Sequence, residues 1–416
     1  MIFSANRRHA GQKFPSFATL ISAALVLVIC WSFFVTVSTE IRENLSDPDE
    51  SEVWLTVNDS AHYYQIAQAI DEGRAIEGYA KHGGYAHRQP LYPLSLALMM
   101  RMGGESAHWL AMVNVIIGVI TAGFIYWAFW TLFDSRIVAL LASLIYSLSR
   151  FIVDHVSHRL NTEPLYILFA IAAVCFALKY VKSGQLRHIA LASAVAGLGY
   201  LTRPNGLFLM GPMIVALLGN DILKHSQESP RVVAKRVGVS LAVAFIIFAG
   251  ITAPSWIPKT VFFGNPIYHA YLPNFMWVDT YEEGHVAGPP RYGPTDYFAD
   301  HGIGDVVTRL SSGSIRVFSE IPISHGRIHY LLTVGGFCVA LLRRRRRDVV
   351  LIIFTALTLT PLVWTALSNP SGRVHYGAWF PFSLFYISLL MEAVPVLAGR
   401  ARPIVTSFCA AVRSGW

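Results

Sequence analysis

Ten long apolar segments recur along the chain, and they constrain its fold more than any other feature. A helix that crosses a lipid bilayer needs about 20 mostly apolar residues. Of the 416 residues, 54% are hydrophobic and only 14% are charged, whereas a soluble chain usually carries about 25% charged residues. We therefore expect an all-α polytopic membrane protein in which residues 1–416 form a single membrane domain. The predicted spans are 17–37, 107–133, 137–153, 163–181, 187–202, 205–219, 237–257, 329–342, 349–367 and 376–398.

The positive charges predict how these spans are oriented, because lysine and arginine accumulate in cytoplasmic loops. With the N-terminus inside, basic residues fall in every predicted cytoplasmic segment. They are Arg7, Arg8 and Lys13; Arg136; Lys179, Lys182 and Arg187; Lys224, Arg231, Lys235 and Arg236; Arg343–Arg347; and Arg400, Arg402 and Arg413. The net charge of +8 is then a consequence of topology and indicates no nucleic-acid partner. We expect an integral, multi-pass protein of the plasma (inner) membrane with both termini in the cytoplasm, the C-terminal tail being 399–416.

Segment 90–102 is apolar but too short to cross a bilayer, and Pro90 and Pro93 stand at its start. An interfacial or re-entrant helix fits this length. Two long extracytoplasmic loops follow from this assignment, 38–106 and 258–328. The part of the second loop near 280–300 is rich in Gly, Pro, Tyr and Asp, which is typical of irregular structure.

The first outer loop contains a second helical pattern. Tyr63, Ile66, Ala67 and Ile70 recur at helical spacing, which predicts an amphipathic juxtamembrane helix. Asp59 precedes this pattern and has two interpretations. It could be the N-cap that accepts backbone N–H groups, or an acid beside the bilayer that serves as a general base.

Further polar residues stand at the outer ends of other spans. Arg88 lies before the proline-fixed turn, where it could contact lipid headgroups or recognise a phosphate with its planar donor fork. Glu163 stands where a span re-enters the membrane, and carboxylates at that depth are expensive and usually functional. The spacing of His155 and His158 would permit a metal pair, although two histidines alone are weak evidence for one. Arg203 and Arg373 occupy two more outer turns.

In their order along the chain, these short motifs resemble those of the GT-C superfamily of membrane glycosyltransferases. The resemblance is to the branch that contains protein O-mannosyltransferases and the lipid A aminoarabinose transferase. The matching stretches are Asp59 with Tyr63–Tyr64, Arg88–Pro93, Thr162–Pro164, Leu201–Pro204, Gly264–Pro266, and Arg373 before Trp379–Pro381.

The resemblance implies an extracytoplasmic active site and a sugar donor carried on a polyprenyl phosphate. Asp59 would be the catalytic base, Glu163 a second acid of the same cavity, and Arg88, Arg203 and Arg373 the ligands of the donor phosphate. Expected substrate contacts beside these motifs are His62, Tyr63, His87, Tyr92, His375 and Tyr376. No cofactor is expected, and a divalent metal is possible in principle but not indicated, since a phosphate paired with arginines is a good leaving group. The acceptor, whether protein, lipid or glycan, is left open.

Two features depart from the family pattern. O-mannosyltransferases usually carry an Asp-Glu pair in the first outer loop, but here Asn58 and Ser60 flank Asp59. Asp49–Glu50 forms such a pair and is an alternative position for the base. The second departure is that we expect no large soluble domain after the last span of this sequence. Acceptor recognition is then left to the two long outer loops.

Two other classes of protein compete with a glycosyltransferase. A transporter or flippase for a lipid-linked or anionic substrate usually shows internal repeats or charges in mid-membrane. A membrane scaffold would not need several arginines and acids on one face. The charges of this chain cluster at the ends of spans without a clear repeat, which favours the enzyme.

Overall fold

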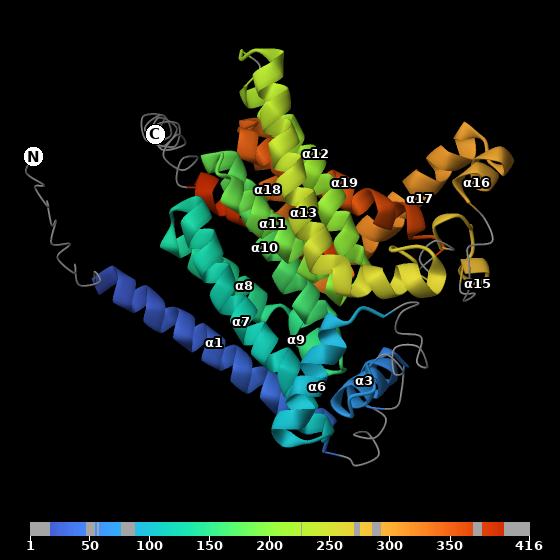
Figure 1. Cartoon of the computed structure of the whole chain (residues 1–416). Helices are drawn as coiled ribbons and strands as arrows, with labels where there is room; N and C mark the ends of the chain where they lie inside the picture. Colours follow the sequence, from blue (N-terminus) through green and yellow to red (C-terminus); the bar gives the residue numbers. More distant parts are fainter. Residues whose placement is uncertain are drawn as a thin grey trace, which may run out of the picture.

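The computed structural model of the protein describes residues 17–46, 55, 58–75, 88–225, 227–269, 275–284, 293–368 and 377–394. Within these ranges the regular elements are helices, as the composition predicts. Most of the long helices run side by side in one bundle (Figure 1). The helices are α1 (Phe17–Asn44), α3 (Asn58–Asp71), α6 (Leu91–Gly103), α7 (Ala107–Phe133), α8 (Arg136–Leu148), α9 (Arg150–Ser157), α10 (Glu163–Ser183), α11 (Leu186–Thr202), η1 (Pro204–Gly206), α12 (Leu207–Lys224), α13 (Pro230–Phe263), α15 (Tyr281–Gly284), α16 (Pro294–Asp300), α17 (Ile303–His325), α18 (Arg327–Arg343), α19 (Arg346–Thr365) and the C-terminal helix Gly377–Val394.

The long helices make the chain an integral multi-pass membrane protein. In the described part, seven helices are long and apolar enough to cross a bilayer, and eight if the bent pair α8 and α9 forms one span. The other two predicted spans coincide with α11 and α18, which have 17 residues each. Each predicted span therefore coincides with helical residues. Seven of these spans, or eight with the bent pair, have the length and apolar composition that crossing a membrane requires.

The span expected as one helix over 137–153 is broken. It ends at Leu148, and α9 continues after a bend of 51°. Ser149 between them has an extended backbone, with φ −68° and ψ 115°. Serine side chains compete with the helical backbone for hydrogen bonds, and small polar residues are frequent at sharp kinks. The apolar pattern continues through this bend, so it does not reveal the break.

The two helices predicted in the first outer loop form and pack on each other. The face of α3 that carries Ile66 and Ala67 is fully buried, and α3 packs against α6. Polar contacts also hold the two together, since Arg101 Nε bonds to Asp71 Oδ1 at 2.9 Å. The apolar face of α3 is therefore covered by protein. With 13 residues, α6 is as short as expected, and its first-turn Pro93 fits a position that needs no intrahelical N–H donor.

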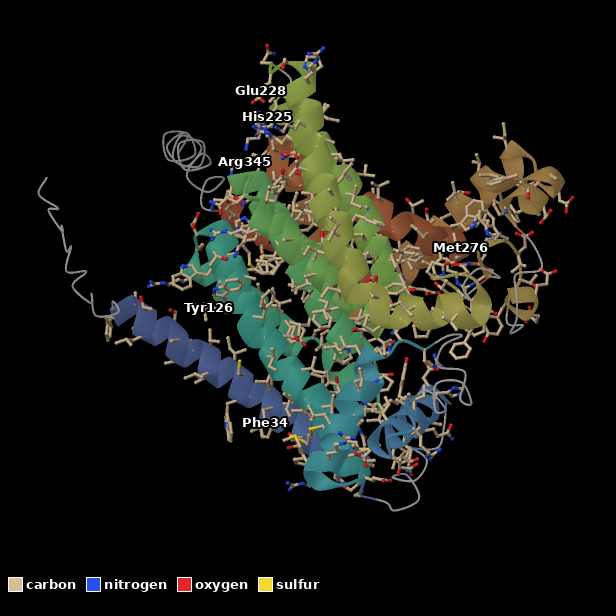
Figure 2. All side chains as sticks on the ribbon, in the orientation of Figure 1. Phe34, Tyr126, His225, Glu228, Met276 and Arg345 are labelled. Atoms are coloured by element: carbon tan, nitrogen blue, oxygen red, sulfur yellow. The ribbon has the colours of Figure 1, made fainter. Side chains whose placement is uncertain are left out.

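Polar contacts gather at both ends of the bundle. At one end, Arg343 and Arg347 bond to Glu392 at 3.0 and 2.8 Å, and Lys182 pairs with Asp134 at 2.8 Å. Figure 2 shows His225, Glu228 and Arg345 toward this end, far from α3 and α6. These are the segments predicted to be cytoplasmic. The helices α3 and α6 of the first predicted outer loop lie at the opposite end (Figure 1).

The second long outer loop is more ordered than its composition suggests. The backbone of α13 stays helical to Phe263, and α17 is a 23-residue helix inside the region expected to be a loop. Its buried positions Gly313, Val317 and Ile321 recur every four residues, so one face packs on the bundle. Ile315 and Ile323, outside this stripe, are exposed, and so is Ile303 at the first position of the helix, as suits a helix lying against lipid.

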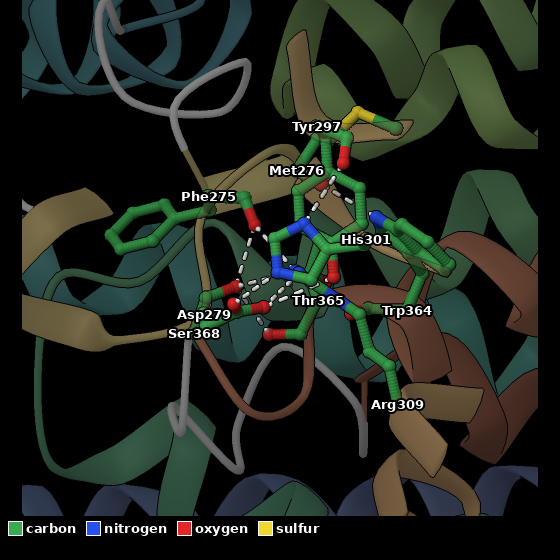
Figure 3. A network of polar contacts seen from close by, with 9 residues as sticks. All are labelled: Phe275, Met276, Asp279, Tyr297, His301, Arg309, Trp364, Thr365 and Ser368. Carbon is green, nitrogen blue, oxygen red and sulfur yellow. Dashed lines mark hydrogen bonds and ion pairs between the residues drawn. The ribbon is translucent and has the colours of Figure 1, made fainter. Parts of the chain in front are cut away.

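A buried arginine joins this region to the bundle (Figure 3). Arg309 of α17 is 3% exposed, and its Nη1 bonds to Asp279 Oδ1 at 2.8 Å. Its Nε donates to the Trp364 carbonyl of α19 at 2.9 Å. Asp279 also accepts hydrogen bonds from the Tyr297 hydroxyl at 3.0 Å and from His301 Nε2 at 2.9 Å. The Arg309–Asp279 ion pair and the hydrogen bonds around it thus connect the 275–284 segment with α16, α17 and α19.

Candidate functional site

The first pair of the candidate site joins α3 to the segment before α6. Arg88 Nη2 lies 2.6 Å from Asp59 Oδ1, and the Arg88 guanidinium also lies over the Tyr63 ring, 5.3 Å from its centroid. Asp59 is not the N-cap of α3, because the helix already includes Asn58 and the carboxylate is bound by Arg88. The helical spacing of Asp59 and Tyr63 puts both on the side of α3 that faces Arg88.

The second pair joins two helix ends. Glu163 is the first residue of α10 and only 2% exposed, and its Oε1 lies 2.5 Å from Arg203 Nη1. The same guanidinium nitrogen donates to Thr162 Oγ1 at 3.3 Å. The N-terminus of a helix carries partial positive charge, which also favours a carboxylate there. The buried carboxylate thus has a cation and a helix end as neighbours.

The turn that follows α11 sets the position of Arg203. Pro204 disfavours the α conformation in the residue before it, and Arg203 is extended, with φ −146° and ψ 144°. The helix therefore ends at Thr202 and the chain reverses into η1. A β-carbon at Gly206 would lie 2.1 Å from the backbone nitrogen of Tyr200, so only glycine fits this close approach.

The two pairs form one electrostatic cluster. Burial lowers the pKa of Arg203, but Glu163, Tyr63 and Asp59 act on it together and raise that pKa above its ordinary value. The Tyr63 ring meets the Tyr92 ring edge to face at 5.2 Å. Tyr92 is fully buried, and its hydroxyl donates a hydrogen bond to Asn114 at 3.0 Å. The position of its ring is therefore fixed, and the Tyr63 ring packs against it.

The C-terminal helix begins beside the same cluster. A β-carbon at Gly377 would lie 3.8 Å from Glu163 Cγ. The predicted site residues Arg373, His375 and Tyr376 precede this glycine in the sequence, but they lie outside the described residues, as do His87 and the alternative pair Asp49–Glu50. His62 is described, half-buried on α3 one turn after Asp59. Four predicted residues, Asp59, Arg88, Glu163 and Arg203, are thus brought together at one end of the bundle.

Several buried polar residues of this end were not predicted. Gln89, next to Arg88, accepts a hydrogen bond from Ser255 Oγ of α13 at 2.8 Å. Lys259, one turn further along α13, is 1% exposed and lies 5.8 Å from the centroid of the Tyr200 ring. The sequence carried a usable signal, since Lys259 falls just after the apolar run of a span. Only tertiary structure shows that it points inward.

One group of described side chains could hold a cation. Glu40, Asp154 and His158 each place a ligand atom within 4.8 Å of the others. They line a pocket of about 730 Å³ between α1, α8 and α9. The predicted partner of His158, His155, is not in this group, and its ring packs on Phe151 with centroids 4.2 Å apart. The HxxH spacing therefore does not form a two-histidine site here.

Comparisons with known proteins agree with this arrangement. Residues 87–252 match the family described as dolichyl-phosphate-mannose-protein mannosyltransferase, and this segment contains Arg88, Glu163 and Arg203. No curated protein sequence gives a significant match.

Solved structures share the fold across nearly the whole chain. The Archaeoglobus fulgidus oligosaccharyltransferase AglB, in complex with an inhibitory peptide and a dolichol-phosphate, has a TM-score of 0.55 at 12% identity, covering 94% of this chain and 52% of that one. ArnT from Cupriavidus metallidurans, bound to undecaprenyl phosphate, has a TM-score of 0.52 at 15% identity, covering 94% of this chain and 63% of that one. At such identities the likeness concerns the fold. The chain spans between half and two thirds of the length of these proteins. The predicted resemblance to GT-C glycosyltransferases is confirmed.

Proposed function

We propose that this chain, a relative of the GT-C membrane glycosyltransferases, transfers a sugar from a polyprenyl-phosphate donor to an acceptor. The reaction takes place on the extracytoplasmic face of the membrane, at one end of a domain of about ten spans. The proposal is supported most directly by one observation, the convergence of the Asp59–Arg88 and Glu163–Arg203 pairs at one end of the bundle. One carboxylate that acts as base and fixed cations beside it are what a transfer away from a phosphate needs, and both kinds of group are present here. ArnT and AglB were solved with polyprenyl phosphates bound, which agrees with this class of donor.

The transfer inverts the configuration of the sugar. A hydroxyl oxygen of the acceptor attacks the anomeric carbon, and the bond from that carbon to the phosphate oxygen breaks on the opposite side. Asp59 takes the acceptor proton as general base. The bonding electron pair leaves with the phosphate, which departs as polyprenyl phosphate with an additional negative charge. Fixed cations placed at that oxygen stabilise the charge as it develops.

Each residue of the cluster has a place in this scheme. Arg88 holds Asp59 through one oxygen and turns it toward the site, and Arg203 does the same for Glu163. Arg88, Arg203 and Arg373 contribute positive charge around the donor phosphate. Glu163, at the start of α10, positions Arg203 and accepts hydrogen bonds from the sugar or the acceptor. Tyr63, His62, His87, Tyr92, His375 and Tyr376 complete the proposed surroundings of the substrate.

A panel of polyprenyl-phosphate sugars tests the proposal. The purified full chain, in lipid nanodiscs, is incubated with each donor, and binding, sugar release to water and transfer are measured. We expect at least one donor to bind and to release polyprenyl phosphate. Failure of every donor to bind would contradict the proposal. Binding without hydrolysis or transfer would instead favour a flippase.

A further inference from the structure

A second polar cluster lies between α11, α13 and Gln89, the residue that follows Arg88. Its central residue is Lys259, near the outer end of α13 and 1% exposed. The Lys259 ammonium makes no hydrogen bond to any described residue. Its nearest identified neighbour is the Tyr200 ring, 5.8 Å from Nζ to the centroid. Tyr200 is itself buried and lies three residues before Arg203.

The charge of Lys259 is not neutralised by the protein. Among the described lysine and arginine residues, Lys259 and Arg309 are buried. Arg309 has Asp279 as its partner, whereas no described carboxylate pairs with Lys259. Moving an ammonium group from water into a protein interior costs several kcal/mol unless a counter-charge is supplied. A buried lysine without a partner therefore points to a ligand that brings the negative charge.

The neighbours of Lys259 are also rich in donors. Gln89 Nε2 and Trp256 Nε1 are buried and lack hydrogen-bond acceptors at bonding geometry. The Gln89 carbonyl oxygen accepts a hydrogen bond from the Ser255 hydroxyl at 2.8 Å, so the Gln89 NH2 group lies on the side of the Tyr200 hydroxyl. The Tyr200 hydroxyl is within hydrogen-bonding reach of Gln89, Ser255 and Trp256, so the three donors share this one acceptor inside the protein. Several donors around one cation match an anion with several oxygens, such as a phosphate.

Unlike Lys259, the two arginines of the site already have carboxylate partners. Arg88 already faces Asp59, and Arg203 already faces Glu163, so each guanidinium charge is balanced within the protein. Gln89 follows Arg88 in the chain and Tyr200 lies three residues before Arg203, so short stretches of backbone connect the Lys259 cluster to both pairs. A phosphate here would meet an uncompensated positive charge while staying next to the acids that act on the sugar.

We propose that Lys259, together with the Gln89 amide, binds the phosphate of the polyprenyl-phosphate donor. This inference rests on the proposed function and adds to it the residue that supplies the net positive charge. As the bond between sugar and phosphate breaks, the phosphate gains a second negative charge, and Lys259 stabilises it there. Arg88 and Arg203 then serve mainly to hold the two carboxylates.

Binding of the lipid product tests this assignment without any sugar. The full-length protein in nanodiscs is titrated with undecaprenyl phosphate and with undecaprenol, which has the same chain and no phosphate. Lys259→Met removes the charge and keeps the side-chain length. Lys235→Met is the matched control, because Lys235 is exposed on the same helix.

We expect Lys259→Met to raise the Kd for undecaprenyl phosphate about 10- to 100-fold. Lys235→Met should stay within about twofold, and both variants should bind undecaprenol like the wild type.

Stability in the absence of ligand separates binding from a structural role. Because Lys259→Met removes a buried charge that has no partner, we expect its unfolding temperature without lipid to equal or exceed that of the wild type. A much lower unfolding temperature, or an equal loss of undecaprenol binding, would overturn the assignment by showing that Lys259 holds the fold or the lipid tail.

The remaining outcomes distinguish this inference from the proposed function. If Lys259→Met binds undecaprenyl phosphate like the wild type, the inference is wrong and the proposed function stands. If the wild type binds no polyprenyl phosphate at all, both are wrong. Inorganic phosphate is expected to displace the lipid only at millimolar concentration. Displacement at the concentration of the lipid itself would contradict a site for a lipid phosphate and indicate one for free phosphate.

Discussion

Glu163 and Arg203 form an ion pair of 2.5 Å between the N-terminus of α10 and the C-terminus of α11, and both side chains are largely buried. Buried pairs are costly to break, because the remaining charge has no partner, whereas replacing both members by apolar residues is often neutral. This asymmetry makes the pair a sensitive point of the structure and allows its structural and chemical roles to be separated.

Removing one partner of this pair should destabilise the protein strongly. We expect Arg203→Met to lower the free energy of unfolding by about 3–5 kcal/mol, because it leaves the Glu163 carboxylate buried and unpaired. The double variant Glu163→Leu with Arg203→Met should regain most of this loss and remain inactive. Unfolding temperature in detergent and donor turnover check the two effects. Recovery of activity in the double variant would show that neither residue takes part in the reaction.

Asp59 can be tested with a nearly isosteric change. Asp59→Asn keeps an oxygen for Arg88 and removes the proposed base, so we expect transfer to fall by about 10²- to 10⁴-fold while the protein folds normally. Asp71→Asn is the control, since Asp71 ends the same helix and pairs with the exposed Arg101. Turnover and unfolding temperature are measured for both. Near-normal turnover of Asp59→Asn would move the base to another acid, such as Asp49 or Glu50.

The close approach of Gly206 to α11 predicts a steric effect. In Gly206→Ala, the new β-carbon would meet the backbone of Tyr200, so the turn that holds Arg203 must shift. We expect a loss of roughly 1–3 kcal/mol in stability, as for other overpacked sites, together with reduced turnover. Gly211→Ala on α12 is the control. A β-carbon there has open space, and replacing a helical glycine by alanine typically stabilises by about 0.5–1 kcal/mol. Equal stability of the two variants would contradict the geometry of the turn.

His301 should make the second outer segment sensitive to pH. Its Nδ1 faces the Tyr297 carbonyl at 2.8 Å and its Nε2 faces Asp279 at 2.9 Å, so the doubly protonated ring satisfies both acceptors. The hydrogen bond to Tyr297 and the contact with Asp279 raise the pKa of His301 above its usual value. The stabilisation is therefore complete below the pKa of the unfolded chain, about 6.5, and is lost as pH rises through the higher folded value.

Amide hydrogen exchange of 275–284 and 293–302 measures this dependence. We expect exchange in these segments, corrected for its intrinsic pH dependence, to accelerate as pH rises through the folded pKa of His301. In His301→Ala the exchange should be faster at low pH and lose that step. A step that persists in the variant would assign the titration to another group.

Much of the fold follows from local pattern. The apolar runs predict where helices lie, and the buried face of α3 at Ile66 and Ala67 follows from helical spacing alone. The break at Ser149 and the helix α17 were missed for opposite reasons. Ser149 interrupts an apolar pattern that continues on both sides, while α17 has a helical period inside a region whose neighbouring composition is typical of loops.

The site was predictable only in part. Glu163 and Arg203 stand out because each is a charged residue at the predicted outer end of a span, where charges are costly, and Asp59 and Arg88 stand out because each lies beside a predicted juxtamembrane helix. Which acid faces which arginine depends on helix packing and could not be read from spacing. Lys259 also stands at the end of a span, but that position alone does not distinguish it, because a lysine there is normally an anchor in the lipid headgroups. Its burial becomes visible only when α13 is packed against α11 and Gln89.

The contact between Gly377 and Glu163 has a consequence for synthesis. The chain enters the membrane from its N-terminus, so α10 and its buried carboxylate are inserted long before residue 377 leaves the ribosome. Until then, Glu163 lacks the neighbour that closes its side of the cluster. The proposed site is therefore completed only after the helix that begins at Gly377 has been inserted, long after the two ion pairs are in the membrane.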